Sequence, residues 1–140
     1  MIGNGNLSDV EALAEFGRRL GYMSRLGDEL EDCLNVKGDL LHRLKYESVP
    51  LPLLYAAKSS KKYFKTIETI IDKSQIEPLD VKILLEICFE TNAFDYLLSL
   101  AEENKKKAMG KICLLKPSSA RNALSSMIQQ SYTRIATQVF

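Results

Sequence analysis

A chain of 140 residues that is 46% hydrophobic and 26% charged has the size and composition of one globular domain with a real core. Its formal net charge of +1 excludes a global electrostatic field that would draw the whole molecule to nucleic acid or to an anionic membrane. No stretch reaches the roughly 18 apolar residues of a membrane-spanning helix, and the first residues do not resemble a signal peptide.

Hydrophobic residues recur at helical spacing along almost the whole chain. The segment Ser8-Asp9-Val10-Glu11 is typical of a capping box and predicts a first helix that runs to about Cys33. The predicted core positions of this helix are Leu13, Phe16, Leu20, Met23, Gly27, Leu30 and Leu34. A glycine inside a helix costs about 1 kcal/mol relative to alanine. We therefore expect another helix or a ligand to approach closely at Gly17, Gly21 and Gly27.

The later elements are divided by turn residues and prolines. A short helix is expected from Asp39 to about Tyr46, and Pro52 can occupy the first turn of the next helix. Further helices are predicted over residues 53–73 (one or two helices), 80–90 and 93–115, and from Ser118 or Ser119 onward. No strand-like alternation competes, so the sequence predicts an all-α fold of about six to seven helices in a single domain over residues 1–140.

Two groups of residues have unremarkable expected roles. Cys33, Cys88 and Cys113 are widely spaced without a CxxC pair, which argues against a disulfide framework or a zinc site. They fit a reducing compartment, and we expect a cytoplasmic protein with buried thiols. The lysine runs at residues 58–62 and 105–107 are expected to be solvated helix faces.

The acidic segment Asp28-Glu29-Leu30-Glu31-Asp32 lies near the end of the first predicted helix. Residues four apart share a helix face with Cβ atoms about 5–6 Å apart, so Asp28 and Asp32 form a pair of carboxylates. Such a pair suits Mg²⁺, which takes one or two protein carboxylates and fills its other positions with water and substrate phosphates. The alternative interpretation is a solvated acidic helix end, because charged residues are common in all proteins.

Three segments together resemble the trans-isoprenyl diphosphate synthases: residues 17–32, Asp39-Leu40 and residues 49–56. They are similar to the second aspartate-rich region of that family, in which a Gly-x-x-Leu-Gly helix enters Asp-Asp-x-x-Asp and a Thr-Leu-Pro-Leu helix start follows. The segments Thr91-Asn92-Ala93-Phe94 and 115–121 match the family's C-terminal helices. The resemblance covers nearly the whole chain and implies the C-terminal half of the isoprenoid synthase fold.

The reaction that this resemblance implies is prenyl transfer. An allylic diphosphate ionises, isopentenyl diphosphate attacks the cation, and Mg²⁺ stabilises the leaving diphosphate. The resemblance implies that Asp28 and Asp32 hold Mg²⁺, and Glu29 stands where the family's second aspartate usually stands.

The basic residues depart from the family pattern. Ser48 stands in the place of the family's diphosphate-binding lysine, and Arg43 and Lys45 are the nearest substitutes, of which Lys45 is the expected one. Arg25 stands one turn before Asp28 and is expected either to pair with a carboxylate or to bind diphosphate with its bidentate guanidinium.

The family's first Asp-Asp-x-x-Asp motif and its isopentenyl diphosphate-binding residues do not occur in this sequence. The resemblance therefore implies a domain that is incomplete and inactive alone: either a fragment of a longer synthase, or a chain whose missing half is supplied by another polypeptide. We also expect a homo-oligomer as the alternative to such a second chain. We expect allylic and isopentenyl diphosphates as ligands and no nucleic acid. The alternatives are a non-catalytic helical partner or regulatory subunit of a complete synthase, and a helical oligomerisation domain with a chance acidic end.

Overall fold

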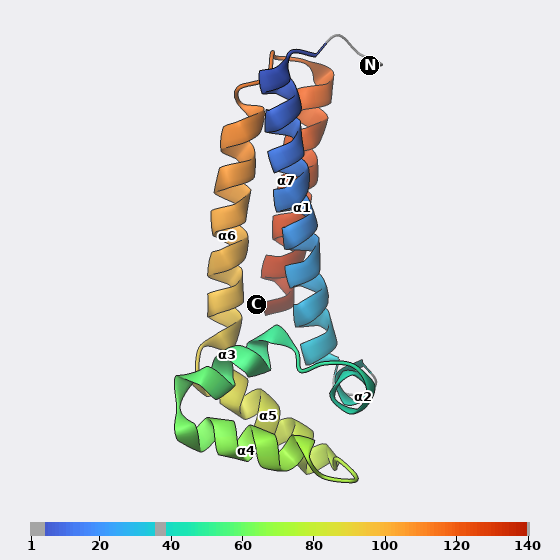
Figure 1. Cartoon of the computed structure of the whole chain (residues 1–140), viewed down its shortest axis with the longest axis vertical. Helices are drawn as coiled ribbons and strands as arrows, with labels where there is room; N and C mark the ends of the chain where they lie inside the picture. Colours follow the sequence, from blue (N-terminus) through green and yellow to red (C-terminus); the bar gives the residue numbers. More distant parts are fainter. Residues whose placement is uncertain (1–4, 36–38, 140) are drawn as a thin grey trace. The chain divides into compact units, whose positions relative to one another are not determined.

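A computed structural model describes residues 5–35 and 39–139 of the chain (Figure 1). Within these residues every regular element is an α-helix, which confirms the predicted all-α fold. The seven helices are α1 (Leu7–Leu34), α2 (Asp39–Tyr46), α3 (Leu51–Ser59), α4 (Lys61–Ile71), α5 (Pro78–Glu90), α6 (Ala93–Ile112) and α7 (Ser119–Val139). Among these seven, no helix combines the length and the apolar character that crossing a bilayer requires.

The helices form two compact units. Unit 1 holds the described residues up to Gly27 together with residues 98–138, so it contains most of α1, most of α6 and nearly all of α7. Unit 2 holds residues 28–97, which include the end of α1, all of α2 to α5 and the start of α6, together with Val139. Whether the two units behave as the single domain expected over residues 1–140 stays a prediction.

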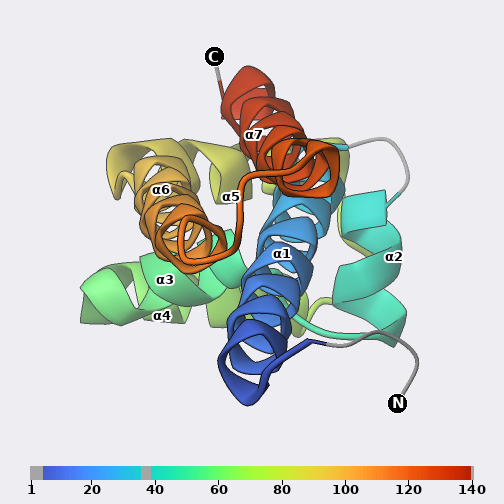
Figure 2. The same ribbon diagram turned by 90° about the horizontal axis from the view of Figure 1, so that it is seen from above.

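Unit 1 consists of three long helices that run alongside one another (Figures 1 and 2). Its core is mostly aliphatic, with one buried aromatic ring at Phe16, and its fully or nearly fully buried residues include Ala12, Phe16, Met23, Leu26, Ala101, Ala108, Ile112, Ile128 and Ile135. Two polar contacts tie the helices together. Arg19 Nη1 of α1 donates to Asn104 Oδ1 of α6 at 3.1 Å, and Lys105 Nζ of α6 lies 4.1 Å from the ring centroid of Tyr132 of α7.

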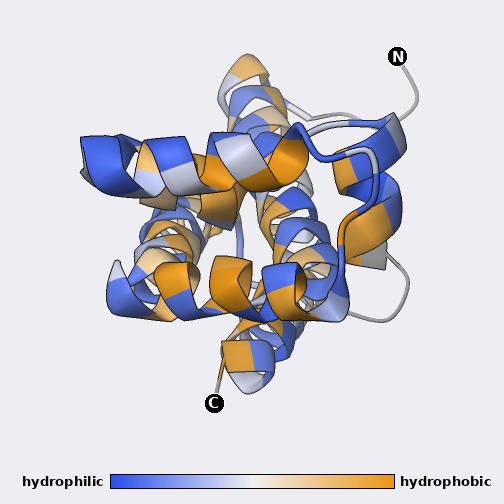
Figure 3. Cartoon of the chain, turned by 90° about the horizontal axis from the view of Figure 1, so that it is seen from below, coloured by the Kyte–Doolittle hydropathy of each residue, from blue (hydrophilic) through white to orange (hydrophobic). Residues whose placement is uncertain are grey.

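Unit 2 is built from shorter helices that pack through one apolar side each. Figure 3 shows hydrophobic and hydrophilic residues alternating along these helices, as amphipathic helices require. The buried residues of this unit include Leu30, Cys33, Leu40, Leu53, Ala56, Ile67, Ile70, Leu84, Ile87, Cys88, Phe94 and Leu97. The rings of Tyr55 in α3 and Tyr96 in α6 stack with centroids 4.2 Å apart.

Several helix ends differ from the sequence-based expectation. Asn6, not Ser8, caps α1, because Asn6 Oδ1 accepts the backbone N–H of Asp9 at 2.8 Å. Ser60 separates α3 from α4, and its Oγ accepts the backbone N–H of Tyr63 at 3.2 Å. The fifth helix begins at Pro78, since Glu77 is its N-cap and Asp80 completes a capping box. The predicted bounds of α2 agree with the structure.

Two expectations about α1 are wrong. Leu13 was a predicted core position, yet it is 43% exposed. Gly17 and Gly21 are exposed, and a Cβ atom added at either glycine would meet no described atom within 4 Å. Only Gly27 of the three has a neighbour, since an added Cβ would lie 3.6 Å from Ile135 Cγ1, which is an ordinary van der Waals contact. The expectation that another helix approaches Gly17 and Gly21 is therefore wrong within the described residues, whereas the approach of a ligand stays a prediction.

Candidate carboxylate and guanidinium site

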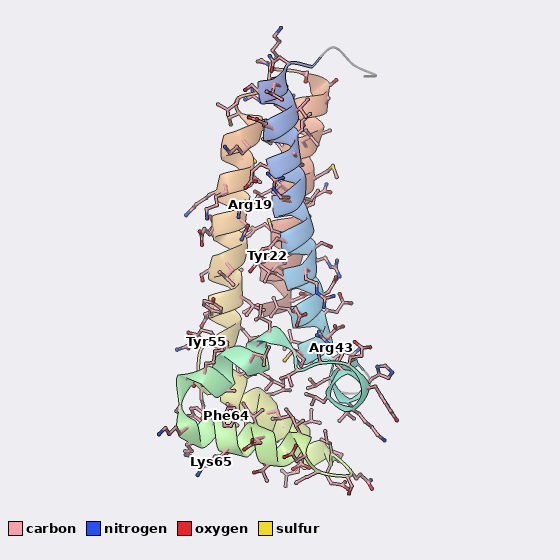
Figure 4. All side chains as sticks on the ribbon, in the orientation of Figure 1. Arg19, Tyr22, Arg43, Tyr55, Phe64 and Lys65 are labelled. Atoms are coloured by element: carbon pink, nitrogen blue, oxygen red, sulfur yellow. The ribbon has the colours of Figure 1, made fainter. Side chains whose placement is uncertain are left out.

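Arg43 is the centre of a charged cluster in unit 2 (Figure 4). It belongs to α2, is only 5% exposed, and reaches the acidic end of α1. Its Nη1 lies 3.1 Å from Glu29 Oε2 and 2.8 Å from Asp32 Oδ2, and its Nη2 lies 3.2 Å from Glu29 Oε1. Nη2 also donates to Ser48 Oγ at 3.1 Å. One guanidinium thus joins two carboxylates of α1 to the segment that follows α2.

Glu29 has both carboxylate oxygens engaged in this cluster. Besides the two contacts with Arg43, Glu29 Oε2 accepts the backbone N–H of Leu51 at 2.9 Å. Leu51 is the first residue of α3, and the residue before it, Pro50, has no side chain that can accept this N–H. The carboxylate of Glu29 therefore takes the place of an N-cap side chain and puts a negative charge at the positive end of the α3 dipole.

Asp32 is more open than Glu29, with a side chain that is 31% exposed. Arg43 contacts its Oδ2, and within the described residues its Oδ1 makes no hydrogen bond. Asp28 lies one turn earlier on α1 and is half-buried. The predicted pair of carboxylates therefore stands on one helix, with one oxygen of Asp32 fixed by Arg43.

The charges of this cluster stabilise one another. Burial lowers the pKa of Arg43, whereas the hydrogen bonds and charges of Glu29 and Asp32 raise it. The second effect is the larger in sum, so the pKa of Arg43 lies above its usual value and the guanidinium stays charged. Arg43 Nε is buried and makes no hydrogen bond; Glu47 Oε2 lies 4.0 Å from it. Four of the five N–H groups of Arg43 face partners within the protein. Its main role is therefore structural rather than ligand binding.

The other two predicted diphosphate-binding residues lie apart from this cluster. Lys45 follows Arg43 by two residues, which is about 200° around a helix, so the two side chains leave α2 on different sides. Lys45 is exposed and borders a cavity of about 520 Å³ whose lining is Leu41, Leu44, Lys45, Ile71, Lys73, Ser74, Gln75 and Ile76. Arg25 is exposed on the part of α1 that belongs to unit 1.

The candidate metal site consists of two carboxylates, those of Asp28 and Asp32. Among the residues that the structure describes, no group of three or more His, Cys, Asp or Glu side chains could bind a metal ion. Two carboxylates are still enough for Mg²⁺, which keeps several waters and substrate phosphates as ligands. Asp28 and Asp32 fit this requirement, whereas Glu29 does not, because both of its oxygens are already engaged.

The bridging role of Arg43 and the part played by Ser48 were not foreseen from the sequence. Helical periodicity relates residues within one helix, but Arg43 belongs to the next helix, 14 residues after Glu29. One feature of the sequence could have indicated this contact. Pro50 and Pro52 mark a helix start without a side-chain cap, and both an acidic cluster and Arg43 precede it in the chain.

Comparisons with models of protein families, with curated proteins and with solved structures find no match for this chain.

Proposed function

We propose that this chain is a prenyl diphosphate synthase-type helical domain that binds Mg²⁺-diphosphate at Asp28 and Asp32. The observation that carries the proposal is the arrangement at Asp32, where Arg43 fixes Oδ2 while Oδ1 makes no hydrogen bond within the described residues, one turn after a second aspartate. An oriented carboxylate with one available oxygen is what a Mg²⁺ ligand needs.

Each residue of the cluster has a distinct part in this proposal. Bound Mg²⁺ would supply Lewis-acid stabilisation of the charge that develops on a departing diphosphate. Asp28 and Asp32 would hold the ion, and Arg43 would orient Asp32 and balance the negative charge of α1 between turnovers. Glu29 holds α2 and α3 in place, so that the carboxylate pair faces a fixed environment.

The proposed domain does not complete the reaction alone. The sequence contains one aspartate motif of this kind, and a diphosphate needs charge and position from more than one side for its ionisation to become fast. We therefore propose that the other half of the site comes from sequence outside these 140 residues, either in the same protein or in a different polypeptide.

A titration of MgCl₂ with inorganic pyrophosphate tests the proposed site directly. We expect binding heat for the wild-type chain and its loss in Asp28→Asn/Asp32→Asn. Glu31→Gln/Glu86→Gln is the matched control, because it also removes two negative charges, from exposed positions on helices of the same unit. Circular dichroism establishes that both variants keep their helices. Incubation of the purified chain with allylic and isopentenyl diphosphates should give no prenyl transfer, and measurable turnover would contradict the proposed incompleteness.

A second candidate function is that of a non-catalytic helical partner or regulatory subunit of a complete synthase. The observation that favours it is the tight engagement of Glu29 and Arg43 with each other, which removes two charged groups from ligand binding. Equal heats for wild type and Asp28→Asn/Asp32→Asn in the same titration would favour this second function.

A further inference from the structure

The two lysine runs of the sequence differ in how their charge is neutralised. The run at residues 105–107 in α6 is matched by acidic residues of the same helix. Lys105 Nζ and Lys106 Nζ each lie 3.7 Å from a carboxylate oxygen of Glu102, and Lys107 forms an ion pair with Glu103. Lys106 and Lys107 are exposed, as the predicted solvated helix face requires, whereas Lys105 is half-buried.

The other run is not neutralised. Lys58 at the end of α3 and Lys61, Lys62 and Lys65 at the start of α4 are all exposed. None of these four lysines makes an ion pair within the described residues, whose ion pairs involve other lysines. We call these four residues the lysine patch. It places four positive charges within eight residues of sequence, around the Ser60 junction of two helices.

An exposed aromatic residue, Phe64, lies in the same segment of α4 as the lysine patch. Phe64 of α4 is 51% exposed, whereas Ile67 and Ile70 of the same helix are buried. Figure 4 labels Phe64 and its neighbour Lys65 on α4. Phe64 and Leu54, which is also exposed, border an almost wholly apolar groove of about 210 Å³ between α3 and α4. Glu68 and Asp72 line the same groove: Glu68 stands one turn after Phe64 and Lys65, and Asp72 follows the end of α4.

We propose that the lysine patch and Phe64 form a docking surface for an anionic phospholipid membrane. Clusters of four to eight basic residues on an amphipathic helix are attracted to anionic headgroups, and an aromatic side chain beside them can enter the boundary between headgroups and acyl chains. Asp72 lies eight residues after Phe64, so the proposed orientation places the start of α4 at the membrane and the end of α4 farther from it.

The chemistry of the patch favours a lipid surface over nucleic acid. All four cations are lysines, which act as point charges, and the patch contains no arginine to hold phosphate or guanine with a bidentate fork. Its only large uncharged surface is aliphatic and aromatic, from Leu54 and Phe64. The attraction is local, because charges are screened beyond about 8 Å at physiological salt, so the net charge of the whole chain does not decide it. The proposal does not depend on the cluster at Arg43.

Sedimentation with lipid vesicles tests the proposal. The full chain is mixed with vesicles of phosphatidylcholine alone and of phosphatidylcholine with about 30% phosphatidylserine, at low and at high salt. We expect binding only to the anionic vesicles at low salt, and at least about tenfold weaker partitioning for Lys58→Gln/Lys61→Gln/Lys62→Gln/Lys65→Gln. The matched control is Lys106→Gln/Lys107→Gln/Lys111→Gln/Lys116→Gln, which removes the same charge from exposed lysines outside the patch and should bind like the wild type.

A fluorescence experiment tests the part played by Phe64. The chain contains no tryptophan, so Phe64→Trp introduces a single reporter. Its emission should shift to the blue on addition of anionic vesicles, whereas Tyr22→Trp, at another exposed aromatic position, should not shift.

Three results would overturn the proposal. The first is equal partitioning of the lysine-patch variant and its matched control, because binding would then not depend on this surface. The second is an unchanged emission of Phe64→Trp with vesicles that sediment the protein. The third is that the chain binds no vesicle but binds single-stranded or double-stranded oligonucleotides through the same lysines. This result would assign the surface to nucleic acid.

Discussion

Arg43 of α2 and Glu29 of α1 form a two-contact ion pair in which Nη1 lies 3.1 Å from Oε2 and Nη2 lies 3.2 Å from Oε1. Both side chains are nearly inaccessible to solvent. Such a pair adds little net stability compared with apolar residues, but removing one partner leaves a buried charge without compensation. The pair therefore makes the chain sensitive to substitutions on either side.

The first prediction is that Arg43→Ala lowers the free energy of unfolding by about 3 kcal/mol, because two carboxylates lose their cation and Leu51 loses an oriented acceptor. Arg43→Lys should recover only part of this loss, since lysine cannot make the two-contact pair. Urea unfolding followed by circular dichroism measures both effects. The control is Arg18→Ala, which removes an exposed arginine paired with Glu15 on the same helix and should change the midpoint far less. Equal midpoints for Arg43→Ala and Arg18→Ala would contradict the structural role of Arg43.

The second prediction concerns the exposed glycines of α1. Gly17→Ala and Gly21→Ala should each raise the free energy of unfolding by about 0.5–1 kcal/mol, because glycine is costly inside a helix and a new Cβ meets no described atom within 4 Å. Thermal unfolding of the single and double variants measures the gain. A loss of stability in either variant would mean that a neighbouring chain or ligand approaches this stretch of the helix.

The positions of the helices could be predicted from the sequence more accurately than the burial and tertiary contacts of their side chains. Helical spacing and the prolines were enough to predict the bounds of α2, since both determine the backbone locally. Spacing could not tell that Leu13 faces solvent, because it identifies an apolar face without identifying the helix that covers it. Likewise Asp28 and Asp32 were predicted as a pair from their separation within one helix, whereas the contact of Asp32 with Arg43 joins two different helices and depends on tertiary packing.

The third prediction follows from Asp80, which is buried at the start of α5 and lies 2.5 Å from Lys73 Nζ. The hydrogen bond from Lys73 and that from the Glu77 backbone N–H hold the pKa of Asp80 below its usual value of 3.8. A carboxylate with a lowered pKa stabilises the fold above its unfolded-state pKa, and this contribution is lost as the pH falls through the folded-state value.

The urea midpoint of the wild type should therefore fall between about pH 5 and pH 2 by more than that of Asp80→Asn. Lys73→Gln should reduce the same pH dependence, because it removes the largest cause of the lowered pKa. Identical pH profiles for the wild type and Asp80→Asn would show that another group governs acid unfolding.

The fourth prediction concerns the three cysteines. Cys33 and Cys88 are buried in unit 2, as expected, whereas Cys113 is exposed, so the expectation of a buried thiol is wrong for Cys113. A hydrogen bond with Cys33 and then burial raise the pKa of the Cys88 thiol, which keeps it in the unreactive neutral form. A thiol reagent such as Ellman's reagent should therefore modify one cysteine rapidly in the folded chain and three in urea. Cys113→Ser should abolish the rapid reaction, and a rapid reaction that persists in this variant would place one of the other thiols within reach of solvent.

The hydrogen bond from Leu51 to Glu29 joins residues that are 22 positions apart, so the beginning of α3 depends on a side chain from an earlier helix. Short helices are marginal in isolation, because nucleation fixes several residues for one hydrogen bond. A peptide of residues 47–60 lacks the distant acceptor and should be largely unstructured in water. The first N–H of α3 is thus satisfied only when α1 is in place, so this helix start is a tertiary feature of unit 2 rather than a local one.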